Sequence, residues 1–159
     1  MPTQKKPSVK KTEGSAKARK SSARLAAVQV LYQMRLNNQD AKSTLRAYIE
    51  RRSGFELDGD ILVPADEELL TDIIMGLQKR WEDVDAIVAK TLADGGKSGV
   101  ELLLECILRA GTYELLAHGS IDTGIIINDY LNVTTSFYDG TEPKLVNAVL
   151  DKVAKAVRE

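Results

Sequence analysis

The sequence holds few of the residues that build catalytic or metal centres. It has one cysteine and one histidine among 159 residues, so it can form neither an internal disulfide nor a Cys/His metal cluster. It also lacks a glycine-rich phosphate loop. Cys106 lies among leucines with no base placed to activate it, as is typical of a small core residue. We therefore expect a protein that is not an enzyme and needs no cofactor or metal.

Long apolar runs are absent as well. The most apolar stretch, VELLLECILRAGTYELL at 100–116, is shorter than a membrane span and carries Arg109 in its middle. No apolar run follows the basic N-terminus, which argues against a secretory signal. A lone cysteine fits a reducing compartment. These features favour a cytoplasmic protein that does not enter the membrane.

The charge is distributed unevenly although the net charge is only −1. Residues 1–24 contain eight basic residues and one acid, which gives this segment +7 and leaves −8 for the remainder. A basic segment on an acidic body is typical of proteins that bind polyanions. The alternative is a solubilising tail without a target.

Helical periodicity covers the chain from residue 21 onward. Apolar residues recur at helical spacing in seven segments, at about 21–37, 40–53, 65–77, 84–92, 100–116, 122–137 and 143–157. Residues 53–64 contain Gly54, Gly59 and Pro64 and are expected to form a loop. The pattern predicts an all-α fold, a compact bundle of about seven helices.

The stretch at 100–116 is the predicted central helix. It is apolar over most of its circumference and must therefore be buried among neighbours, with its polar residues confined to a narrow wet strip: Glu101, Glu105, Arg109, Thr112 and Glu114. Ser98 is expected to cap it, and His118 lies at its end, where a cation is favourable. In the last segment Asn147 interrupts an apolar run, so we expect its amide to be buried or half-buried and hydrogen-bonded.

Residues 1–20 are mostly Lys, Ser, Thr, Ala and Pro. Such a segment buries too little apolar surface to offset the entropy of ordering, and we expect a flexible arm in the free protein. Ser21 or Ser22 is positioned to cap the first helix. The predicted domain organisation is a basic arm at 1–20 and a helical domain at 21–159.

Three segments resemble a known family when they are taken together. The first is ARLAAVQVLYQ at 23–33, directly after the basic arm. The second is ILRAGTYEL at 107–115. The third is INDYL at 127–131, followed by Ser136-Phe137 and KLVNAVLDK at 144–152. Their order and spacing are similar to those of the bacterial transcription antitermination factor NusB family, over about residues 20–155.

This resemblance implies a fold of two small helical subdomains. It also implies binding to the single-stranded boxA element of nascent ribosomal RNA. The protein partner would be NusE, a small-subunit ribosomal protein, and the pair would join the elongating RNA polymerase complex. Carried over to this sequence, the RNA contacts are Lys17, Arg19, Lys20, Arg24 and Lys144. Tyr32, from the AVQVLY motif, is the candidate partner contact, with a core tyrosine as its alternative.

Two other functions remain open from the sequence. One is a stand-alone RNA-binding module related to the N-terminal domain of ribosomal RNA cytosine methyltransferases, which the resemblance implies to share this fold. The other is a protein–protein adaptor that never binds RNA. Binding of a boxA-like oligonucleotide, with and without NusE, distinguishes them.

Overall fold

The computed structural model describes residues 15–52, 56–57, 60–61 and 63–158. This part of the chain forms seven helices and one pair of two-residue strands. The helices are α2 Ala16–Asn37, α3 Ala41–Arg52, α4 Glu67–Lys79, α5 Trp81–Asp94, α6 Leu102–Ala117, α7 Thr123–Phe137 and α8 Glu142–Arg158. The strands, β1 Glu56–Leu57 and β2 Asp60–Ile61, pair antiparallel within the segment expected to be only a loop. The all-α prediction is confirmed.

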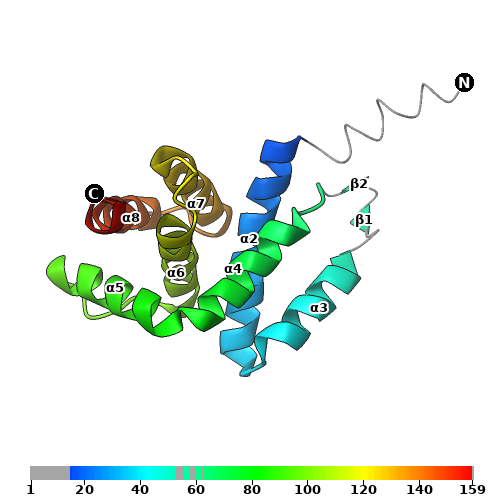
Figure 1. The fold of residues 1–159 in the computed structure, drawn as a ribbon, viewed down its shortest axis with the longest axis horizontal. Helices are drawn as coiled ribbons and strands as arrows, with labels where there is room; N and C mark the ends of the chain where they lie inside the picture. The colour runs from blue at the N-terminus through cyan, green and yellow to red at the C-terminus, as the bar shows by residue number, and fades with distance from the viewer. Residues whose placement is uncertain (1–14, 53–55, 58–59, 62, 159) are drawn as a thin grey trace, which may run out of the picture.

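The helices form two packed groups around α6 (Figure 1). Helices α2, α3 and α4 contact one another, and α7 and α8 pack together on the other side of α6, where α5 also lies. Helix α6 contacts α2, α4, α5, α7 and α8. Because it has neighbours on all sides, its apolar circumference is covered, as its sequence predicts.

The predicted wet strip on α6 is wrong for three of its five residues. Arg109 is buried, and Thr112 and Glu114 are fully buried. Surrounded by five helices, α6 has no side left for water along this part of its length. Buried charges need partners, and the partners of Glu114 shape the site described below.

Helix α2 begins earlier than the sequence analysis predicts. Ser15, not Ser21 or Ser22, is the N-cap, and its hydroxyl accepts a hydrogen bond from the Ala18 amide at 3.0 Å. The sequence that follows the cap, Ala-Lys-Ala-Arg-Lys, consists of strong helix formers. Contact with α4 adds support, because the Asp66 amide donates to the Arg19 carbonyl at 3.0 Å. The boundary of the predicted arm at residue 20 is therefore wrong, and residues 1–14 lie outside the described residues.

The ends of other helices are also defined by local caps. Asp40 caps α3 by accepting from the Ser43 amide at 3.0 Å, and Gly95 ends α5. Ser98 does not cap α6, since Glu101 occupies the N-cap position.

The prediction for Asn147 is also wrong, because its side chain is exposed. The buried stripe of α8 is formed by Val146, Val149, Leu150, Val153 and Ala154. Asn147 is rotated by about 100° around the helix axis from the buried Val146, and it therefore faces solvent.

Helices α4 and α6 approach each other closely at Gly76. A Cβ atom at this position would lie 1.9 Å from the Tyr113 hydroxyl oxygen. Because Gly76 has no side chain, the Tyr113 ring can pass over α4 at this point, and its hydroxyl donates a hydrogen bond to Asp72. Glycine is thus required here by packing.

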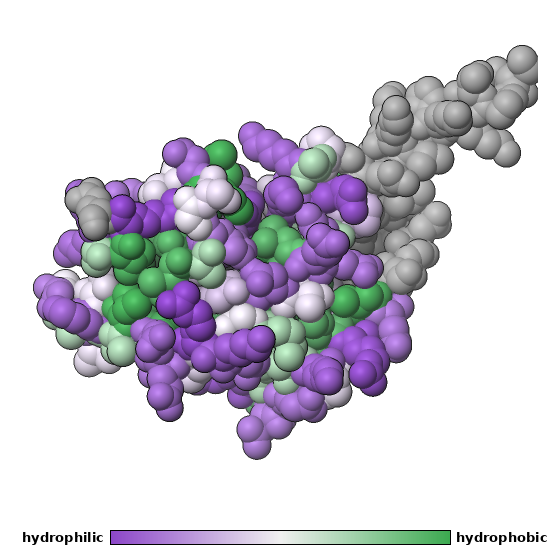
Figure 2. All heavy atoms as spheres, in the orientation of Figure 1, coloured by the Kyte–Doolittle hydropathy of each residue, from purple (hydrophilic) through white to green (hydrophobic). Residues whose placement is uncertain are grey.

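The molecular surface is mixed in polarity. Figure 2 shows hydrophilic side chains over most of one face and an apolar area where α5 and α8 lie. None of the described helices is both long and apolar enough to span a membrane.

Leu108 provides a direct test of the central position of α6. Its side chain is fully buried, so Leu108→Ala should lower the free energy of unfolding by roughly 2–5 kcal/mol. The matched control is Leu36→Ala, since Leu36 is 60% exposed and surface substitutions stay within about 0.5 kcal/mol. Urea denaturation measures both, and equal effects of the two substitutions would contradict the packing described.

Candidate functional site

The N-terminal turns of α2 present the basic residues that the sequence analysis selected. Lys17 and Arg19 are exposed, and neither forms an ion pair with another described residue. Lys20 is also exposed, and its Nζ lies 3.2 Å from Asp66 Oδ2 at the start of α4. Three cations within four residues on one helix end form a local positive surface, named here the basic turn: Lys17, Arg19 and Lys20.

Arg24 does not belong to the basic turn, contrary to the sequence-based assignment. Its side chain is 2% exposed. Nε and Nη2 donate to the two oxygens of Glu114 at 2.7 and 2.9 Å, and Nη1 donates to Asp129 Oδ2 at 2.7 Å. A guanidinium held in this way offers nothing to an RNA phosphate, so Arg24 is a structural residue.

Glu114 is the centre of the buried network that holds Arg24. The Tyr130 hydroxyl donates to Glu114 Oε2 at 2.6 Å, and His118 Nδ1 lies 2.9 Å from Oε1. Burial alone would raise the pKa of Glu114, but hydrogen bonds from His118 and Arg24 outweigh it and lower the pKa to about 2. Glu114 is therefore ionised at neutral pH, and three side chains hydrogen-bond to it: Arg24, His118 and Tyr130. Glu114, these three residues and Asp129 are called here the Glu114 cluster.

Two further connections extend the Glu114 cluster, and the second one reaches α4. Ser21 Oγ donates to Asp129 Oδ1 at 2.8 Å, which fixes α2 against α7 just below the basic turn. His118 Nε2 lies 2.5 Å from Asp72 Oδ2 of α4, and the Tyr113 hydroxyl also donates to Asp72 at 3.2 Å. The cluster thus joins α2, α4, α6 and α7 and sets where the basic turn stands.

Sequence reasoning missed Glu114 and Asp129 as partners of Arg24. A signal was present, because Glu114 lies in the most apolar helix of the chain and an acid there requires a buried partner. The partners lie 90 and 105 residues from Arg24. Nothing in the helical spacing connects residues so far apart in the chain.

Lys144 is exposed at the start of α8. Among the described residues, no hydrogen bond or ion pair joins its side chain to Lys17, Arg19 or Lys20. It forms no ion pair with another described residue. It remains a separate candidate on α8, which is joined to α2 through α6 and α7, since both of these helices pack against α2 and α8.

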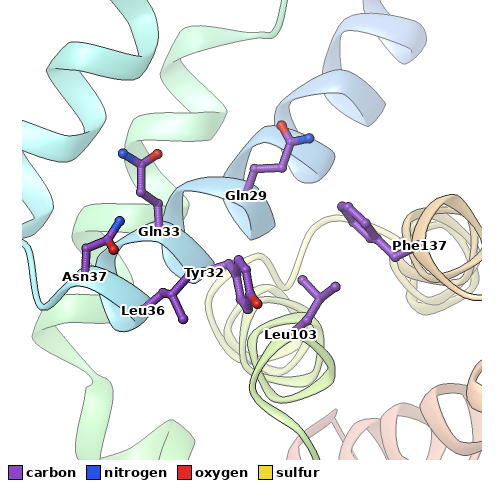
Figure 3. A pocket seen from close by; sticks show the side chains of 7 residues that line it. All are labelled: Gln29, Tyr32, Gln33, Leu36, Asn37, Leu103 and Phe137. Carbon is purple, nitrogen blue, oxygen red and sulfur yellow. The ribbon is translucent and has the colours of Figure 1, made fainter.

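Tyr32 lies in a surface groove between α2 and the α6–α7 side of the molecule (Figure 3). The groove has a volume of about 390 Å³ and is lined by Gln29, Tyr32, Gln33, Leu36, Asn37, Leu103 and Phe137. Leu36 and Phe137 are 60% and 37% exposed although both follow the apolar pattern of their helices. Tyr32 itself is half-buried, so it is both a packing residue and part of an open surface.

Chemistry based on nucleophiles or metals finds no support in the described residues. Cys106 is buried, and burial raises the pKa of its thiol to about 11. A thiol with such a pKa is a poor nucleophile at neutral pH. Within the ranges that the structure describes, no three His, Cys, Asp or Glu residues are grouped so as to hold a metal ion.

Comparison with known proteins gives consistent results. The NusB family model matches residues 21–155. The chain is 38% identical over 140 residues to the transcription antitermination protein NusB of Rhizobium rhizogenes, covering 87% of this chain and 88% of that protein. It is 36% identical over 141 residues to the protein of the same name from Bartonella tribocorum, covering 88% of this chain and 90% of the relative.

Two solved structures are similar in fold. One is NusB of T. maritima, with a TM-score of 0.70, 20% identity, and coverage of 86% of this chain and 90% of that one. The other is a complex of the antitermination factors NusB and NusE with dsRNA, again with a TM-score of 0.70, at 24% identity and with coverage of 89% and 99%.

The two hydrogen bonds of His118 predict a pH-dependent stability. The hydrogen bond with Glu114, followed by the one with Asp72, raises the pKa of His118 above 6.5. This stabilisation is complete below the unfolded pKa and is lost as pH rises through the folded pKa. We expect the difference in unfolding free energy between wild type and His118→Gln to be largest near about pH 6 and to shrink by about pH 9. Urea denaturation across this range measures it, and a pH-independent difference would exclude a charged His118.

Proposed function

The chain belongs to the NusB family of transcription antitermination proteins, and we propose that it binds boxA-type single-stranded RNA together with NusE. Through this pair it joins the elongating RNA polymerase complex in the cytoplasm. The observation that carries the RNA part of the proposal is the basic turn, which stands exposed at the same end of the chain as the basic N-terminal segment.

Phosphate neutralisation supports RNA binding at this end of the molecule. Residues 1–24 hold eight cations. Of the four that the structure describes, Arg24 is buried in the Glu114 cluster, while Lys17, Arg19 and Lys20 are exposed. Lys17, Arg19 and Lys20 project from a helix that is fixed at Ser21 and Arg24. Cations on a rigid helix lose little further entropy on binding, so they favour a defined path for the RNA backbone.

The groove around Tyr32 supports a protein partner. Its seven lining residues include neither lysine nor arginine, so it offers no countercharge to phosphate. Glu101 is exposed and accepts a hydrogen bond from the hydroxyl of Tyr138, the residue after Phe137, so its carboxylate lies near one end of the groove. An apolar groove with a carboxylate at one end fits a basic protein, which electrostatic attraction would steer toward it. We assign this groove to NusE and the basic turn, with Lys144 as a further contact, to RNA.

The test replaces Lys17, Arg19 and Lys20 by glutamine. Affinity for boxA RNA should fall, and the slope of log affinity against log salt should decrease by about 2, since each single-strand phosphate contact contributes roughly 0.7. NusE binding should be unchanged because it uses the groove. Fluorescence anisotropy at several salt concentrations, with and without NusE, measures the effect.

The matched control replaces three exposed lysines elsewhere in the chain by glutamine: Lys90 on α5, Lys97 in the segment between α5 and α6, and Lys152 on α8. This variant should keep the wild-type slope. If the wild type, the basic-turn variant and the control have equal slopes of log affinity against log salt, the basic turn does not contact RNA. Failure of the wild type to bind RNA, with NusE bound normally, would favour the protein–protein adaptor.

A further inference from the structure

The groove carries a regular row of amide side chains. Gln29, Gln33 and Asn37 follow one another at intervals of four residues on α2, so their Cα atoms rise by about 6 Å from one to the next. A polypeptide in extended conformation repeats every two residues, at about 6.6 Å. The spacing of the amides therefore matches that of successive outward-facing backbone groups in an extended chain laid along the helix.

These amides have hydrogen-bonding capacity to spare. Gln29 uses its oxygen to accept from the Tyr48 hydroxyl at 2.9 Å, and its NH₂ group has no hydrogen-bond acceptor among the residues that the structure describes. Gln33 makes one long contact, from Nε2 to the Gln39 oxygen at 3.4 Å. Asn37 makes no side-chain hydrogen bond with the rest of the described chain and is exposed. Each can exchange hydrogen bonds with a backbone amide or carbonyl.

An apolar row runs beside the amide row. In Figure 3 the three amides lie above Leu36, Tyr32 and Leu103, and Phe137 lies at the end of the groove near Gln29. An extended chain directs alternate side chains to opposite sides. A segment whose backbone faces the amides can therefore place every second side chain on the apolar row.

We propose that the occupant of the groove is an extended segment of the protein partner, with apolar side chains at alternate positions and its backbone hydrogen-bonded to Gln29, Gln33 and Asn37. This inference rests on the proposed function, which assigns the groove to NusE. The neutral lining and the exposed Glu101 near the Phe137 end favour a segment that carries a basic residue beside its apolar ones.

The amide row and the apolar row make it possible to distinguish an extended occupant from a helical one. A helix satisfies its own backbone groups, so it would use the apolar row and have little need of the amides. An extended segment has unpaired backbone donors and acceptors, so it needs both rows. The contributions of the amides to binding therefore decide between the two.

Three variants of the full-length protein test the inference with NusE as the probe. The amide variant is Gln33→Ala with Asn37→Ala, the apolar variant is Leu36→Ala with Phe137→Ala, and the control is Gln78→Ala, an exposed amide on α4. Gln29 is kept because Tyr48 bonds to it. Calorimetry should show about tenfold or greater loss of NusE affinity for the amide and apolar variants, and none for the control. Melting temperatures should match the wild type.

Hydrogen exchange on NusE in the complex gives a readout that a purely structural role of the amides would not produce. A NusE segment should be protected at alternate backbone amides in the wild-type complex and should lose this protection in the amide variant.

The remaining outcomes each overturn a different statement. If the amide variant binds NusE within twofold of wild type and the apolar variant does not, the occupant is not an extended backbone, although the assignment of the groove to NusE stands. If the apolar variant also binds normally, NusE does not use the groove, and the assignment fails. If the amide variant has a lower affinity for RNA in the absence of NusE, the groove binds RNA instead of the protein partner.

Discussion

The buried charge of Glu114 is the constraint on which the arrangement of the helices depends. A carboxylate inside a helical core is tolerated only if it is hydrogen-bonded and paired. Arg24 from α2, Tyr130 from α7 and His118 at the end of α6 supply these partners. Because each comes from a different part of the chain, satisfying one carboxylate fixes the relative position of several helices.

The same constraint separates the structural from the functional cations of α2. Lys17, Lys20 and Arg24 follow one another at helical spacing and lie on one face. Along this face the surroundings change. Arg24 meets Glu114 and Asp129 in the core, Lys20 meets the exposed start of α4, and Lys17 lies in solvent. The core therefore holds the helix at one end and leaves its other end charged and accessible.

The sequence predicts the helices well because their signal is local. Apolar spacing acts within a few residues, and so do the caps that the structure shows, which are Asp40 on α3, Asp66 on α4 and Gly95 at the end of α5. The errors share another origin. The sequence places Arg24 at the RNA, Glu114 on a solvent-exposed strip and Asn147 in the interior. All three predictions are wrong, because solvent exposure depends on neighbours that are distant in the chain. Only the packed structure reveals which face of each helix is covered.

The candidate partner surface shows the same limit. Leu36 and Phe137 fit the apolar stripes of their helices, and the pattern places them in the core. The structure leaves both exposed beside Tyr32. An apolar residue at a helical repeat position is predicted to be buried. The pattern does not distinguish burial in the core of the chain from burial against a partner protein. The amide row on α2 consists of polar residues, which apolar periodicity does not select. Its position along the groove follows only from the packed structure.

The unfolding free energy of Arg24→Met, measured by urea denaturation without RNA or partner, tests most directly whether Arg24 is structural. Methionine keeps much of the side-chain volume but leaves Glu114 and Asp129 without their cation. The account predicts a loss of about 3–5 kcal/mol, the range for removing one member of a buried ion pair, and little change for Lys20→Met at the exposed end of the same face. A change within about 0.5 kcal/mol for Arg24→Met, as for a surface residue, would contradict it.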